Sequence, residues 1–402
     1  MSNRMQVAPL ALLSNHALLW RIFVALALLL CGASIASMAL AGPREQAARI
    51  HDRLAGVPAD EATLTAMAAT LPGNPVAAAN IAMNNPSFYA VTLKNFSAPW
   101  TNRDQNAFVP LNDYMTLVMG MVRDNVPFNQ ILTANLLYTG PASVTPAPSP
   151  TSNAHYEALE ARMRDSTFNQ SQLVQTTQTA VYGTPANATA GAITTRAAAE
   201  AFFINGTNRA MFRFTLMNHM CMDMEQVHDT SIAPDRIRQD VSRSPGGDSR
   251  VFLNNCIGCH AGMDPLAQAF AYYDFDETQN RLVYDSTAVN SKYFNNNATF
   301  GDGFVTPDDS WHNHWRQGQN ALLGWSQTLP GQGAGAKSLG EELAGTQAFA
   351  QCQVKKVFKA VCLRDPVDAN DRNQVDAMTN TFKNAFNLKQ VFAESAGYCM
   401  GN

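Results

Sequence analysis

Residues 255–260 read Asn-Cys-Ile-Gly-Cys-His and contain the pattern CxxCH. In a helix, two cysteines three residues apart lie about one turn apart, and the histidine follows directly. This spacing suits covalent attachment of haem, because each thiol can add to one vinyl group while the imidazole reaches the iron. We therefore expect one covalent haem c, held by Cys256 and Cys259, with His260 as the proximal iron ligand.

Two other kinds of site use a similar pair of cysteines. A zinc site would need two further ligands, for which His312 and His314 are candidates, but zinc ribbons carry a second close pair of cysteines. A thioredoxin-like redox pair needs a βαβ context, whereas the sequence around this motif is rich in alanine and helical in pattern. Haem attachment is therefore the favoured interpretation.

The sixth iron ligand separates an electron carrier from a catalyst, because a strong axial ligand removes the open position that peroxide or oxygen chemistry needs. Residues 264–346 contain no methionine. They do contain His312 and His314, so our first choice is bis-histidine ligation through one of these two. An open iron is one alternative, and the others lie just upstream of the motif: Met220, Met222, Met224 and His228.

The turn Met263-Asp264-Pro265 comes soon after the motif. A proximal histidine usually donates its second N–H to a carbonyl or carboxylate, which Asp264 or the backbone of this turn could supply. Capping of the next helix is an equally suitable role for Asp264. We include Met263 and Pro265 among the haem-binding residues.

The N-terminus predicts export. Arg4 and Arg21 flank a polar start, residues 22–31 form an unbroken apolar run, and Ala39-Leu40-Ala41 offers a cleavage site. We predict a signal peptide over residues 1–41, cleaved after Ala41, and a periplasmic or secreted mature chain that does not span the membrane. An uncleaved anchor is the alternative, because the apolar run and its flank approach the ~20 residues that span a bilayer.

Cysteine usage agrees with export. If two of the six cysteines after Cys31 hold haem, the other four can form two disulfides in an oxidising compartment. A bond between Cys352 and Cys362 is the least favoured, because ten residues of helix separate them by ~15 Å. Both cross-pairings with Cys221 and Cys399 remain open, and free buried thiols are the alternative.

Composition and pattern favour an all-α fold. The chain has 402 residues, of which 46% are hydrophobic and 15% charged, which is enough for more than one core. We predict a helical bundle over residues 42–140, a linker and irregular segment over 141–194, and a cytochrome c-like haem domain over 195–402. A small hairpin is expected within residues 272–304, which are rich in Asp, Asn and aromatic residues.

Helical patterns occur at 46–71, 75–84, 111–124, 156–163, 195–226 and 347–362. We expect the haem helix to pack on the last of these. Its Lys355, Lys356 and Lys359 lie outside the apolar stripe, where they would form either a solvated face or a docking face for an acidic redox partner. The net charge of −4 gives no indication of nucleic-acid binding.

Several separated stretches resemble the planctomycete-type cytochrome c family. The most specific is CIGCHAGMDPL at 256–266, followed by YDFD at 273–276, which is similar to that family's CxxCHxxMDPxGFxxExFD signature. Further stretches that resemble the family are 53–58, 127–134, 191–194 with Asn208-Arg209, and 349–358 with Arg364 and Asp371. The resemblance implies an exported haem protein that acts in electron transfer or in oxidative breakdown of polymers.

Three functions are compatible with these expectations. The first is electron transfer by one haem, with a redox partner protein. The second is a haem enzyme of the peroxidase or oxygenase type with an open distal iron site. The third is a structural or adaptor protein in which the haem holds the fold together.

Overall fold

The computed structural model of the chain describes residues 41–71, 73–203, 208–236, 250, 252–293 and 304–401. The predicted signal peptide lies outside these residues except for Ala41. Residues 43–400 form one compact, mostly helical unit, as the all-α prediction requires. Within the described ranges, no helix is long and apolar enough to cross a bilayer. The expected boundaries near residues 140 and 194 stay predictions.

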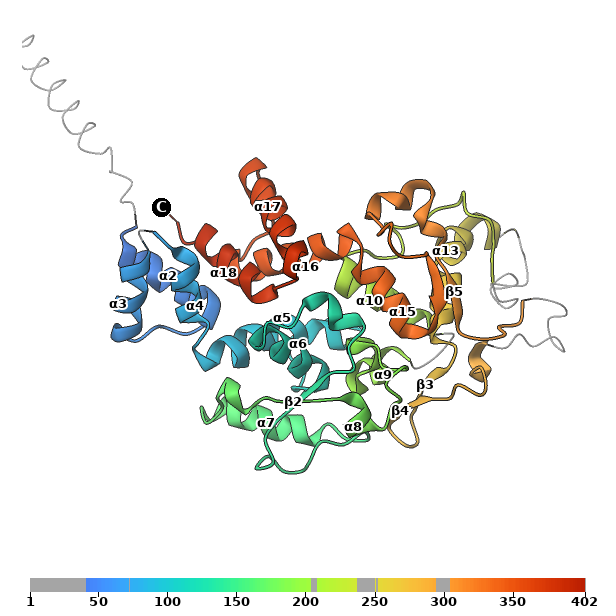
Figure 1. Ribbon diagram of the computed structural model, residues 1–402, viewed down its shortest axis with the longest axis horizontal. Coiled ribbons are helices and arrows are strands. Elements are labelled where there is room, and N and C mark those ends of the chain that lie inside the picture. The colour runs from blue at the N-terminus through green and yellow to red at the C-terminus, as the bar shows by residue number, and fades with distance from the viewer. Residues whose placement is uncertain are drawn as a thin grey trace, which may run out of the picture. The chain divides into compact units, whose positions relative to one another are not determined.

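The first three helices of the unit are α2 (Pro43–Ala55), α3 (Glu61–Thr70) and α4 (Pro75–Ala82). Asp60 and Asn74 cap α3 and α4 by accepting the main-chain N–H of Thr63 (2.7 Å) and Ala77 (2.9 Å). Such caps satisfy N–H groups that the helix itself leaves unpaired. Helix α4 packs against α18 (Leu388–Tyr398), so the two ends of the unit meet (Figure 1).

Longer helices joined by short 3-10 or π-helical turns make up the rest of the unit. From residue 88 to the haem motif these are η1 (Phe88–Leu93), α5 (Lys94–Ser97), η2 (Ala98–Thr101), α6 (Asp113–Arg123), η3 (Phe128–Leu132), α7 (Ala154–Arg164), η4 (Gln170–Gln172), α8 (Gln178–Tyr182), η5 (Gly191–Thr194), α9 (Arg196–Phe202), α10 (Arg209–Met220) and η6 (Phe252–Cys256). They are followed by α13 (Ile257–Ala267), η7 (Gln268–Phe270), η8 (Ser291–Tyr293), η9 (His314–Arg316), η10 (Gly318–Leu323), α15 (Gly335–Ala344), α16 (Gln347–Cys362) and α17 (Ala369–Ala385). The helices predicted at 111–124, 156–163 and 347–362 are confirmed.

Three antiparallel two-stranded ribbons occur in the described ranges. Strands β3 (Tyr273–Asp276) and β4 (Arg281–Tyr284) form the hairpin predicted within residues 272–304. Strand β1 (Leu137–Thr139) pairs with β2 (Val174–Thr176), which lies inside the segment 141–194 predicted as linker and irregular structure. Strand β5 (Ser310–His312) pairs with β6 (Gln332–Ala334).

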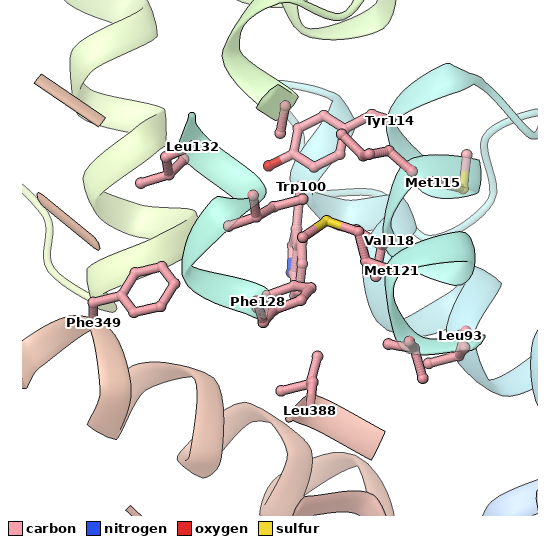
Figure 2. Packing of buried hydrophobic residues seen from close by; sticks show 14 of the residues in the cluster. Leu93, Trp100, Tyr114, Met115, Val118, Met121, Phe128, Leu132, Phe349 and Leu388 are labelled. Carbon is pink, nitrogen blue, oxygen red and sulfur yellow. The ribbon is translucent and has the colours of Figure 1, made fainter. Parts of the chain in front are cut away.

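One hydrophobic core joins early and late parts of the sequence. Figure 2 shows Val118 and Met121 of α6 lying near Phe128 of η3 and Leu388 of α18, all of them buried. Every residue from Asp113 to Val122 in α6 is buried. Because α6 contacts both the earlier segments η1 and α5 and the last helix, α18, its burial depends on distant parts of the unit being folded together.

The four cysteines outside the haem motif form two disulfides, Cys221–Cys352 and Cys362–Cys399. Cys352 and Cys362 both lie in α16 and do not pair with each other, as the helix geometry predicted. The alternative of free buried thiols is wrong for these four residues. Disulfides are typical of proteins that fold outside the cytoplasm, so this result is compatible with export.

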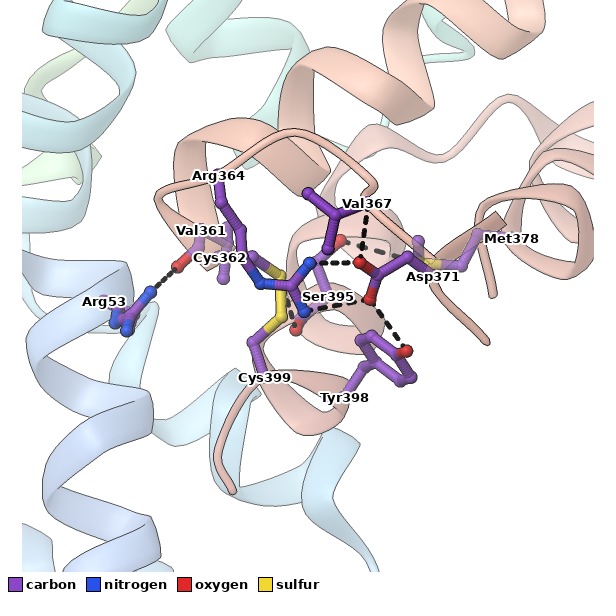
Figure 3. The surroundings of a disulfide bond; sticks show 10 residues. All are labelled: Arg53, Val361, Cys362, Arg364, Val367, Asp371, Met378, Ser395, Tyr398 and Cys399. Carbon is purple, nitrogen blue, oxygen red and sulfur yellow. Dashed lines mark hydrogen bonds and ion pairs between the residues drawn. A yellow bond between two sulfur atoms is a disulfide. The ribbon is translucent and has the colours of Figure 1, made fainter. Parts of the chain in front are cut away.

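An ion pair lies beside the second disulfide. Arg364 binds both oxygens of the buried Asp371, and the Tyr398 hydroxyl donates to the same carboxylate at 2.9 Å (Figure 3). Arg53 of α2 donates to the carbonyl of Val361 at 2.9 Å. These contacts hold the C-terminal helices against each other and against the N-terminal one.

The predicted lysine face of α16 is only partly correct. Lys355 and Lys359 are exposed, but the ammonium of Lys356 lies 3.6 Å from the centre of the Trp100 ring and donates to the Asn218 carbonyl at 2.7 Å. Burial lowers the pKa of Lys356 well below its usual value. Helical spacing alone predicts an exposed Lys356, because it does not reveal that the ammonium lies over the ring of a residue distant in the sequence.

Candidate functional site

The CxxCH motif begins a helix, as its spacing predicted. The π-helical turn η6 ends at Cys256, and Cys259 and His260 lie in the first turn of α13. Cys256 and Cys259 are half-buried, and they are the cysteines that remain as free thiols in the described part of the chain. The donor set that haem c requires is therefore present on one helical turn and is not used for disulfides.

The Cys259 thiol lies against the segment upstream of the motif. Its sulfur is 3.6 Å from the carbonyl of Met224, and burial raises the pKa of the thiol, with smaller contributions from Glu225 and Asp223. A thioredoxin-like pair would instead lie in a βαβ context, whereas the helix α13 that carries Cys259 is preceded by the π-helical turn η6 and packs mainly on helix α10.

A buried carboxylate orients His260. The imidazole Nδ1 lies 3.2 Å and 3.3 Å from the two oxygens of Asp264, which in turn receives two hydrogen bonds from Arg209 at 2.7 Å and 2.9 Å. Burial by itself raises the pKa of Asp264, but Arg209 and His260 outweigh it and lower the pKa below its usual value. The carboxylate is thus an anion that accepts the Nδ1 proton, and Nε2 is the nitrogen that would bind iron.

Of the two roles predicted for Asp264, the contact with the second ring nitrogen of His260 is therefore present, and capping of a following helix is not. The turn η7 that comes after α13 has no side-chain cap. Pro265 lies inside α13 and has no N–H to donate, so the helical hydrogen bonding is interrupted close to the C-terminal end at Ala267.

Asn208 and Arg209 attach the start of α10 to the haem-motif helix and to the segment between that helix and β3. The Asn208 side chain is buried and donates to the carbonyls of Phe270 (3.0 Å) and Tyr273 (2.8 Å), while Arg209 binds Asp264. In the sequence, these two residues stand out only through the family resemblance. The main helical partner of α13 is accordingly α10, which itself packs on α16, so the expected direct packing of α13 on α16 is replaced by packing through α10.

The opposite face of α13 is packed tightly. Gly258 and Gly262 lie about 160° around the helix axis from His260. A Cβ at Gly258 would be 2.2 Å from Nε2 of His228, and one at Gly262 would be 2.0 Å from Nε1 of Trp315. Both rings therefore pack against the back of the helix, and only glycine allows them to come so close.

The other two residues assigned to the haem site lie at different angles on α13. Met263 is about 60° and Pro265 about 140° from His260 around the axis, and both are buried. Met263 thus shares the face of the proximal histidine, whereas Pro265 is turned away from it. Their contact with haem stays a prediction.

His312 and His314 lie together, with ring centres 4.5 Å apart. Nε2 of His314 is 2.8 Å from an oxygen of Asp235. Both histidines line a cavity of about 300 Å³ with Asp229, whose main-chain N–H donates to the Gly258 carbonyl. They therefore neighbour the Gly258 side of α13 rather than the His260 side, and iron ligation by either one stays a prediction.

Asn313, between these two histidines, is held by a buried carboxylate. Its side chain donates to Glu342 at 2.8 Å, and Arg316 binds both oxygens of the same residue. Glu342 is 1% exposed, so this network fixes the loop from within the fold.

The upstream candidates for the distal position differ in placement. Met220 and Met224 are buried, and Met222 is partly buried. Met224 contacts the haem motif, because its carbonyl meets the Cys259 thiol. His228 packs against Gly258 on the back of α13, which is unfavourable for a ligand on the far side of a haem bound to His260.

The zinc alternative finds no support in the geometry. Among the residues that the structure describes, no group of three or more His, Cys, Asp and Glu side chains is arranged to hold a metal ion. A structural zinc site needs four such ligands around one point.

No protein-family model, curated protein or solved structure matches the chain. The likeness of residues 256–266 and 273–276 to the planctomycete-type cytochrome c family therefore remains a resemblance of motifs.

Proposed function

We propose that this chain is an exported c-type cytochrome that binds one haem covalently through Cys256 and Cys259 and transfers electrons. The observation that carries the proposal is the free thiol pair on one helical turn, directly before a histidine whose Nδ1 contacts a buried carboxylate. Haem supplies the Fe(III)/Fe(II) couple when it is bound. A redox partner protein would deliver or accept the electron.

Each polar residue around His260 has a defined task in this proposal. Asp264 holds the Nδ1 proton, which fixes the tautomer and the ring orientation and makes Nε2 a stronger donor. Arg209 keeps Asp264 ionised inside the fold, because a buried carboxylate without a partner would take up a proton. Cys256 and Cys259 hold the macrocycle at the same helical turn.

Positive charge beside Asp264 suits the carboxylates of haem. Arg209 and Arg236 both line a small cavity that also includes Asp264 and Gln268. Haem carries two propionate groups, and arginine binds carboxylates with paired hydrogen bonds. We assign Arg236 as the residue that would neutralise a propionate, since its contact with Asp235 is long, at 3.7 Å, whereas Arg209 is paired with Asp264 at 2.7 Å.

A haem enzyme with an open distal iron is the second candidate. The observation that favours it is the placement of His228, His312 and His314 next to the Gly258 side of α13. The ferrous spectrum with and without carbon monoxide separates the two functions. Bands of a six-coordinate, low-spin haem that carbon monoxide leaves unchanged support the carrier, and high-spin bands that shift support the enzyme.

Three variants identify the distal ligand in the same experiment. If His312, His314 or Met224 binds iron, its replacement by alanine converts a low-spin spectrum to a high-spin one. The two variants that do not remove the ligand serve as controls for each other. A low-spin spectrum in all three variants would refute ligation by these residues.

A further inference from the structure

A further cavity lies away from the haem-motif helix and is larger than the one beside His312 and His314. It has a volume of about 520 Å³, within the ~300–1,000 Å³ range of small-molecule sites. Its walls come from residues 101–112, the start of α7, helix α9 and the turn between β3 and β4, and they include no residue of α13. The site is thus independent of the haem-attachment helix.

Arg196 is the charged group built into this cavity. It is 7% exposed, and its two terminal nitrogens donate to Glu200 (3.0 Å) and Asn280 (2.9 Å). Its Nε is buried and has no hydrogen-bond partner. Each terminal nitrogen carries a second N–H beyond the one used in these bonds, so the guanidinium can still donate to an acceptor oxygen of a ligand in the cavity.

The remaining polar groups indicate the charge of that ligand. Glu157 and Glu200 line the cavity with Arg196, so acidic groups outnumber the basic one. The side-chain amide of Asn153 donates to the Leu111 carbonyl at 2.9 Å and to Glu157 at 3.2 Å, which fixes this wall. An anionic ligand would meet net repulsion, whereas hydroxyl groups can both donate to carboxylates and accept from Arg196.

An exposed aromatic residue belongs to the loop that forms one wall of the cavity. Phe108 is 95% exposed and directly precedes the lining residue Val109. Its main-chain N–H donates to Asn106 (2.8 Å), whose own N–H donates to the lining residue Asn102 (2.9 Å). The loop is therefore held by its side chains while it presents a large apolar ring to solvent.

We infer that this cavity binds an uncharged saccharide, with Arg196, Glu157 and Glu200 bonding its hydroxyl groups and Phe108 covering one apolar face of a sugar ring. Amide and carboxylate groups at the walls match adjacent hydroxyls in both donor and acceptor character. Val109, Pro110 and Ala201 supply the apolar part of the lining.

Calorimetric titration of the haem-loaded mature protein tests this inference. The probes are cellotetraose and chitotetraose, both uncharged, with tetragalacturonate as an anionic comparison. We expect one uncharged probe to bind at a single site. Glu200→Gln should weaken it about tenfold, because a hydrogen bond to a charged group contributes about 1.5 kcal/mol or more.

Two further variants complete the design. Phe108→Ala removes a fully exposed side chain, so it should fold normally and still weaken binding. Glu341→Gln changes an exposed glutamate of α15 outside the cavity and should leave binding unchanged. The inference is overturned if neither uncharged probe binds at about 10 mM, if Glu200→Gln and Phe108→Ala both bind like the unaltered protein, or if tetragalacturonate binds best.

Discussion

Replacement of Asp264 by asparagine would keep the shape of the side chain and remove its charge. The carboxylate lies 3.2 Å from Nδ1 of His260, on the opposite side of the ring from the nitrogen that would bind iron, and Arg209 on the other side of the carboxylate cancels most of its charge. We expect about 1 kcal/mol of interaction with the iron to remain. An anion near the proximal ligand favours Fe(III), so Asp264→Asn should raise the reduction potential by about 40 mV.

The assay is a spectroelectrochemical titration of the haem-loaded variant beside the unaltered protein. Asp365→Asn is the control, because Asp365 pairs with Lys359 at the surface, where both side chains are more than 60% exposed. Asp264→Asn should also lower the free energy of unfolding by about 3 kcal/mol, because it removes the ion pair between Arg209 and the buried carboxylate. A variant that binds haem and has an unchanged potential would refute the proposed coupling between Asp264 and the iron.

Three further predictions concern stability. Gly262→Ala should lower the free energy of unfolding by about 1–3 kcal/mol in a denaturant titration, because the new methyl group overlaps a buried ring, whereas Gly73→Ala meets open space and should be nearly neutral. Joint replacement of Cys221 and Cys352 by alanine should lower the melting temperature and cost about 5 kcal/mol, since the bond closes a loop of 131 residues; equal stability would contradict this. The side-chain bond from Arg364 holds the pKa of Asp371 well below its usual range. The ionised carboxylate therefore stabilises the fold above about pH 4, and this stabilisation is lost as the pH falls through the lowered pKa. In urea titrations, the free energy of unfolding should fall less on acidification in Asp371→Asn than in the unaltered protein.

Local features of the fold could be predicted from the sequence. Helix α16 has the bounds that its apolar period predicted, 347–362, and α6 (Asp113–Arg123) lies within the predicted range 111–124; Thr346 and Asn112 cap the two helices. Helical periodicity and caps depend on residues within one or two turns, which a single sequence contains. The hairpin in residues 273–284 is likewise a consequence of local composition.

Contacts between distant residues could not be predicted in the same way. Arg209 and Asp264 are 55 residues apart, and nothing in their separate surroundings indicates that they pair. The choice between the two remaining disulfide pairings likewise depends on how α10, α16 and α18 pack. The saccharide cavity combines four separate segments, so its lining exists only in the folded chain.

The central claim is that two thiols and an imidazole of one helical turn bind a haem covalently. Its most direct test is the intact mass of the mature protein purified from a strain competent in cytochrome c assembly, measured under denaturing conditions beside Cys256→Ala and Cys362→Ala. We expect the added mass of one haem in the unaltered protein and in Cys362→Ala, which loses only a disulfide. An unaltered protein with the mass of the bare polypeptide, or a Cys256→Ala variant with an unchanged haem spectrum, would contradict it.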